Sequence, residues 1–155
     1  MSRFNYGGDS YSNYCFLWES RVLRVIEGKR GQRVMREFAE ALLALPQRRL
    51  IAGNISTPQG EVCAIGAYAK AKGVNLNRES ASLDDETLVG WEGSESETAE
   101  LGESLGMTYT LAWEIGSKND EEFAAHRYTP EERWEAMYRW AVSHVEKWNL
   151  PAVIG

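Results

Sequence analysis

The chain has 155 residues, of which 43% are hydrophobic and 26% charged, and its net charge is −6. This composition is typical of one folded domain and excludes a disordered chain. No apolar run approaches the roughly 20 residues that span a membrane, and the negative charge argues against general affinity for nucleic acids. Two cysteines cannot build a disulfide framework and the first residues lack an apolar signal core, so we expect a cytoplasmic protein.

The first predicted elements are an arm and two helices. Residues 1–13 are rich in Ser, Asn, Gly and Tyr and are predicted to be a flexible arm. Apolar residues then recur at helical spacing over 14–27 and again up to Pro46, which ends the second helix. The two stripes are Cys15, Trp18, Val22, Val25 and Ile26, and Val34, Phe38, Ala41, Leu42 and Leu45. On the second helix, Arg33 with Glu37 and Arg36 with Glu40 are opposite charges four residues apart, as in solvated pairs.

The segment between these helices reads Gly28-Lys29-Arg30-Gly31. A glycine before a helix start could allow a backbone nest for phosphate. The spacing matches neither the P-loop nor the dinucleotide fingerprint, whereas Gly28 stands where a helix end takes a residue with positive φ. The favoured interpretation is a joint between two helices, with Lys29 and Arg30 exposed at its tip.

After Pro46 the pattern changes to short apolar runs around a Pro58-Gln59-Gly60 turn signal. We predict a small β-hairpin over 49–67 that runs into a short helix capped by Gly73. The alternative is that 61–72 is all helical, because alanine is the best helix former. In both cases the small residues at 64–71 indicate close backbone approach to a neighbouring element.

The second half of the chain is predicted to hold three more helices. Residues 94–97 resemble a capping box that opens a helix to about Leu105, and Thr108 or Tyr109 begins the next. The last has Thr129 as N-cap with Pro130 at the first helical position, and its apolar stripe includes Trp134. The expected fold is therefore α-dominated (α+β): about five helices with a small hairpin in one domain over 14–150, followed by a tail at 151–155.

Charge is distributed unevenly along the chain. From 21 to 49 there are eight basic residues against three acidic ones, and from 78 to 135 sixteen acidic residues against four basic ones. The two segments could attract each other within the fold, or present separate charged faces to partners. The candidate acidic partner-binding residues are Asp84, Asp85, Glu86, Glu92 and Glu95.

Five stretches taken together carry a resemblance. GKRGQR, LALPQRRLIAG, GEVCAIGA, LAWEIGSKND and TPEERW, in this order within 20–148, are similar to a family of small uncharacterised proteins of phages and prophages. The resemblance implies a phage context, and hence the cytoplasm of a host cell, but no reaction.

Few residues suggest catalysis. Cys63 lies among small residues at a predicted helix start, where a thiolate would be favoured, but a buried structural cysteine is the commoner arrangement. Asn119-Asp120 is a second candidate site, with a turn in which Asp120 caps a helix as the alternative. Neither zinc nor calcium spacing occurs. We therefore predict no metal site, no cofactor and no enzymatic activity.

Surface residues suggest binding instead. Trp91 and Trp140 are less obviously buried than the other tryptophans and are candidate protein contacts. The expected function is a non-catalytic accessory protein that binds a host protein, for example to inhibit a bacterial defence system. Two alternatives remain: a nucleic-acid-binding module that uses Lys29, Arg30, Arg48 and Arg49, and a Cys63-dependent enzyme.

Overall fold

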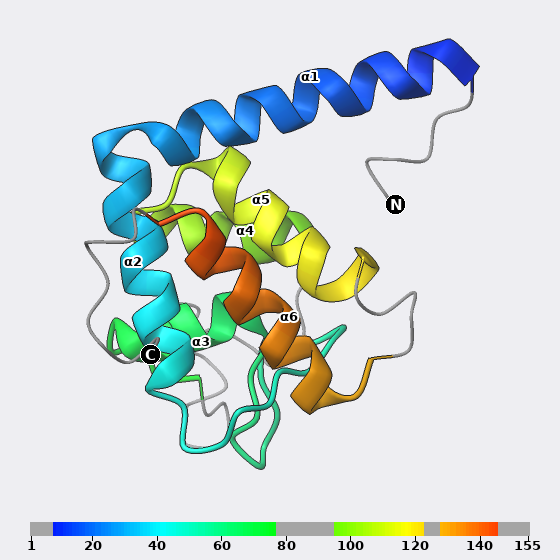
Figure 1. The fold of residues 1–155 in the computed structure, drawn as a ribbon. Coiled ribbons are helices and arrows are strands. Elements are labelled where there is room, and N and C mark those ends of the chain that lie inside the picture. Colours follow the sequence, from blue (N-terminus) through cyan, green and yellow to red (C-terminus); the bar gives the residue numbers. More distant parts are fainter. Residues whose placement is uncertain (1–7, 77–94, 123–127, 146–155) are drawn as a thin grey trace.

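The computed structural model describes residues 8–76, 95–122 and 128–145. In the described residues six α-helices follow one another: α1 Gly8–Glu27, α2 Lys29–Leu43, α3 Ala64–Ala71, α4 Glu95–Ser104, α5 Tyr109–Ser117 and α6 Pro130–Ser143, with a π-helical turn at Lys118–Glu122 directly after α5. The α-dominated prediction is confirmed (Figure 1). Helix α1 begins at Gly8, so residues 8–13, predicted as part of an arm, are helical.

Helix α3 is the most completely enclosed part of the core along residues 64–69. It contacts α2, α4 and α5, and its residues Ala64 to Ala69 are all buried. A helix that is apolar on all sides belongs in a core rather than on a surface. Large buried side chains of the surrounding elements, among them Phe38, Ile115 and Trp134, complete the core.

The joint between α1 and α2 is confirmed, although its geometry differs from the prediction. Gly28 is the N-cap of α2 with φ −71° and ψ 165°, so it does not use the positive φ expected of it. Gly31 lies inside α2. A Cβ atom there would stand 1.9 Å from the Val25 carbonyl oxygen and 2.8 Å from the Ile26 Cα, so glycine is required because α2 crosses the end of α1 at close range.

The hairpin predicted over 49–67 is not formed. This part of the chain holds an isolated antiparallel bridge between Ser56 and Val62, and no strand is described there. Some backbone pairing remains across this segment, since the N–H of Ile51 donates to the Val62 carbonyl and the N–H of Cys63 to the Ile55 carbonyl, each at 3.0 Å. The pairing does not extend into a strand because the backbone groups of Leu50 bond elsewhere. The N–H of Leu50 donates to the carbonyl of Pro130 at 3.0 Å, and the Leu50 carbonyl accepts from Arg133.

The predicted helix ends are largely confirmed. Thr129 and Glu132 form a reciprocal capping box at the start of α6, and Thr108 accepts a hydrogen bond from the N–H of Leu111 at the start of α5. The ambiguous segment 61–72 becomes helical at Ala64, and Gly73 follows the helix with φ +88°. Asp120 does not cap a helix, because it lies inside the π-helical turn.

Candidate functional site

The start of α3 brings together the two candidate sites predicted from the sequence. Cys63 is the N-cap of α3, and its sulfur accepts the N–H of Gly66 at 3.3 Å. The Cys63 N–H donates to the Ile55 carbonyl at 3.0 Å. A Cβ atom on Gly66 would lie 2.4 Å from the same carbonyl oxygen. The small residues at this helix start therefore allow the 55–62 loop to lie directly against it.

Asn119 joins this helix start to the end of α5. Its side chain is buried, with its Oδ1 accepting the N–H of Ala64 at 3.2 Å and its Nδ2 donating to the Ile51 carbonyl at 2.9 Å. The same Nδ2 lies 2.7 Å from Asp120 Oδ1, which also accepts the N–H of Gly53. The π-helical turn thus places an amide and a carboxylate where they satisfy backbone groups of both the loop and α3.

Arg133 closes the cluster from the side of α6, and sequence reasoning had not singled it out. The guanidinium is buried and donates to three carbonyl oxygens: Asn119 at 3.1 Å, Leu50 at 3.0 Å and Tyr128 at 3.4 Å. Burial lowers the pKa of Arg133, and the nearby Asp120 carboxylate partly offsets this effect. An arginine used in this way is a structural connector, since its donors bind backbone carbonyls from three segments of the chain.

The electrostatics of Cys63 oppose a reactive thiol. Burial raises its pKa to about 12, and the hydrogen bond from Gly66 offsets only part of that rise. The neighbouring Asp120 carboxylate raises the pKa further. A thiolate is the nucleophilic form of cysteine, so Cys63 is held in its unreactive form.

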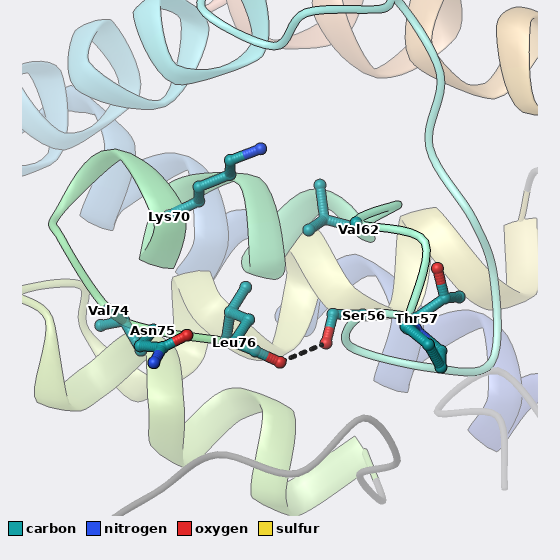
Figure 2. Close-up of a pocket in the computed structure, with 9 residues that line it drawn as sticks. Ser56, Thr57, Val62, Lys70, Val74, Asn75 and Leu76 are labelled. Carbon is teal, nitrogen blue, oxygen red and sulfur yellow. Dashed lines mark hydrogen bonds between the residues drawn. The ribbon is translucent and has the colours of Figure 1, made fainter. Parts of the chain in front are cut away.

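A pocket lies beside the 55–62 loop (Figure 2). It encloses about 210 Å³ between this loop, α3 and residues 74–76, which the Ser56 hydroxyl holds in place by donating to the Leu76 carbonyl at 3.2 Å. Val62, Val74 and Leu76 give it apolar walls, and Lys70 stands at its edge. The pocket could accept a small apolar group, but it contains none of the residues predicted from the sequence.

The four basic candidates do not form one surface. Lys29 and Arg30 lie at the first turn of α2, and Arg48 and Arg49 follow its end. At 1.5 Å per residue, these 15 residues separate the two pairs by about 22 Å.

Three of the four basic candidates are also engaged within the molecule. Arg30 donates to the Gly106 carbonyl at 2.9 Å, and Arg48 lies over the Trp134 ring at 4.9 Å. Arg49 pairs with Glu61 and Glu131. Glu131 belongs to the acidic half of the chain, so the two charged segments do meet at this point.

The aromatic and acidic candidates are placed as follows. Trp140 is half-buried, with Lys118 Nζ 5.4 Å from its ring centre and the His144 ring packed edge-on at 5.3 Å. Burial lowers the pKa of His144, and Lys118 adds to this effect while Glu114 opposes it.

The remaining candidates are mostly outside the described residues. These are Trp91, Asp84, Asp85, Glu86 and Glu92, whereas Glu95 is the first residue of α4.

Sequence reasoning missed one surface that the structure reveals. On α1, Phe16 and Leu17 are 69% and 66% exposed, and Leu23 is 42% exposed. The signal was present, because these residues fall opposite the stripe of Trp18, Val22 and Ile26 at helical spacing. We name Phe16, Leu17, Ser20 and Leu23, with Glu19, Arg21, Arg24 and Glu27 around them, the outer face of α1.

Metal binding and membrane spanning can be checked across all the described residues. They contain no group of three or more His, Cys, Asp or Glu side chains placed to hold a metal ion. None of the described helices is long and apolar enough to cross a membrane. Comparison of the chain with protein-family models, curated proteins and solved structures finds no match.

Proposed function

We propose that this protein is a non-catalytic factor of phage or prophage origin that acts by binding a host protein. The observation that carries the proposal is the structural use of Cys63 and Asn119 at the start of α3. The cysteine is buried with a raised pKa, and the asparagine amide is bonded to backbone on two sides. The side chains best suited to chemistry thus have structural roles, which favours a function performed by residues on the protein surface.

The acidic residues Asp84, Asp85, Glu86, Glu92 and Glu95 are the proposed host-binding surface. Their support is the strong excess of negative charge in this half of the chain. An electrostatic surface of this kind steers association with an oppositely charged partner. The chemistry that fits is a host protein with a basic face, such as the nucleic-acid channel of a defence protein.

The test compares two variants with the same change in net charge. One reverses Asp84, Asp85 and Glu86 to lysine, and the control reverses the exposed Glu40, Glu100 and Glu103 to lysine. Each is used to capture proteins from a lysate of the bacterial host, and the captured protein is then purified for a direct binding measurement. We expect the first variant to bind roughly tenfold more weakly or worse, and the control to bind as the wild type does.

A third variant, Cys63→Ala, separates binding from catalysis. We expect it to capture the same host protein as long as circular dichroism shows that it is folded. If the charge-reversed protein keeps full biological activity while folded Cys63→Ala is inactive, the binding proposal is wrong and the enzyme alternative replaces it.

A further inference from the structure

The outer face of α1 is exposed while the opposite face of the same helix is buried. Phe16 and Leu17 are 69% and 66% exposed, whereas Val22 and Ile26 on the inner face are 5% and 1% exposed. Figure 1 shows α1 along one edge of the molecule, with the other helices on one side of it. Large apolar side chains gathered on one helix face are typical of a protein contact.

The spacing along this face suits helix-to-helix packing. Phe16, Ser20, Leu23 and Glu27 follow one another at intervals of four, three and four residues, the spacing of a coiled-coil seam. Phe16 and Leu23 supply two apolar layers. Ser20 lies between them and is small enough to let a second helix approach closely.

The charges beside the seam favour a second copy in the parallel direction, although the two Glu27 side chains would then face each other where α1 ends. In a parallel pair of helices, consider the residue just before a seam position of one helix. It faces the residue just after the following seam position of the other helix. For this sequence those residues are Glu19 and Arg24, so a parallel pair would form a Glu19–Arg24 ion pair on each side. In an antiparallel pair the flank with Leu17 and Arg24 would face itself, and the flank with Glu19 and Ile26 would face itself, so this ion pair would not form.

We propose that the outer face of α1 binds the outer face of α1 in a second copy of this chain, with the two helices parallel. A contact of two apolar layers is smaller than the roughly 1,200–2,000 Å² that stable interfaces bury, so the dimer forms in a concentration-dependent way. The proposal is independent of the acidic host-binding surface, because the two involve different residues.

The test is the mass of the purified full chain, measured by sedimentation velocity from low micromolar to about millimolar concentration. The wild type should shift from the 17.5 kDa monomer towards twice that mass as concentration rises. Leu23→Asp and Phe16→Asp should each raise the dissociation constant at least tenfold. A wild type that stays monomeric throughout, or a dimer that both variants leave unchanged, overturns the proposal.

A charge swap tests the parallel direction. Glu19→Arg alone should weaken the dimer, and Glu19→Arg combined with Arg24→Glu should restore it, because the ion pair is rebuilt with reversed polarity. Glu40→Arg makes the same charge change at an exposed site on α2 and is the matched control. If the double variant is as weak as the single one, the parallel pairing is wrong. Capture of the host protein should be the same for all these variants, so a failure here leaves the proposed function standing.

Discussion

At the scale of single residues, Gly31 is the clearest case of a residue fixed by its surroundings. Glycine inside a helix ordinarily costs about 1 kcal/mol relative to alanine. Here the space for a Cβ atom is taken by backbone atoms of Val25 and Ile26. The glycine therefore stabilises the α1–α2 joint by allowing contact, although it weakens the helix locally.

Gly31→Ala should lower the free energy of unfolding by roughly 2–4 kcal/mol, because backbone atoms must move to admit the methyl group. Gly28→Ala is the matched control. Gly28 has φ −71°, and the nearest atom to an added Cβ is 3.7 Å away, so the cost should stay below about 1 kcal/mol. Urea denaturation measures both, and equal losses would show that the joint is less tightly packed than described.

Two tyrosines differ in what their hydroxyl groups do. The Tyr68 hydroxyl donates to Glu37 Oε1 at 3.0 Å, whereas the Tyr138 hydroxyl is buried with no hydrogen-bond partner among the described residues. Tyr138→Phe should therefore be neutral or stabilising by up to about 1 kcal/mol, and Tyr68→Phe should cost about 1–2 kcal/mol. Thermal or urea unfolding of the two variants checks which one loses more stability. A larger loss of stability for Tyr138→Phe than for Tyr68→Phe would contradict the prediction.

At the scale of elements, Glu37 connects α2 to the buried helix α3. Its carboxylate accepts from the Tyr68 hydroxyl and from Lys72 Nζ, each at 3.0 Å. Burial alone would raise the pKa of Glu37, but the hydrogen bonds from Lys72 and Tyr68 outweigh it and hold the pKa below its usual value. The charge of Arg33 also helps to lower the pKa of Glu37, so this contact adds to the Arg33–Glu37 pair that the sequence suggested.

The lowered pKa predicts how the α2–α3 contact responds to pH. Because the folded protein binds the proton less readily than the unfolded chain, the contribution of Glu37 is fully present above the unfolded pKa. It is lost as the pH falls through the folded pKa. Glu37→Gln should therefore be less stable than the wild type at pH 7, and the difference should shrink at about pH 3. A difference that stays constant between these two pH values would argue against an ionised Glu37 in the contact.

At the scale of the whole molecule, the sequence predicted local features better than long-range ones. The capping box at Thr129 and Glu132 lies within one turn of helix, so the residue types alone indicate it. The stripe from Val34 to Leu42 predicted the buried face of α2 for the same reason.

The long-range contacts that hold the fold together could not be predicted from the spacing of residues in the sequence. Asn119 bonds to Ala64 and Ile51, and Arg133 bonds to Leu50, all far away in the sequence. These same contacts occupy backbone groups around Leu50 and Ile51, which explains why the hairpin predicted from its apolar residues did not form. Cys63 was placed correctly at a helix start, but its burial depends on the 55–62 loop and on Asn119.

Alkylation of Cys63 in the native protein tests most directly whether the start of α3 is structural or reactive. Cys15→Ser leaves Cys63 as the sole thiol of the chain, and iodoacetamide labelling is followed by mass spectrometry from pH 6 to 9.5. With a pKa raised to about 12 by burial, native Cys63 should react at least about a hundredfold more slowly than in urea, because labelling must await local opening. Rapid labelling of the folded protein with an apparent pKa below about 8.5 would contradict a structural Cys63 and restore the case for an enzyme.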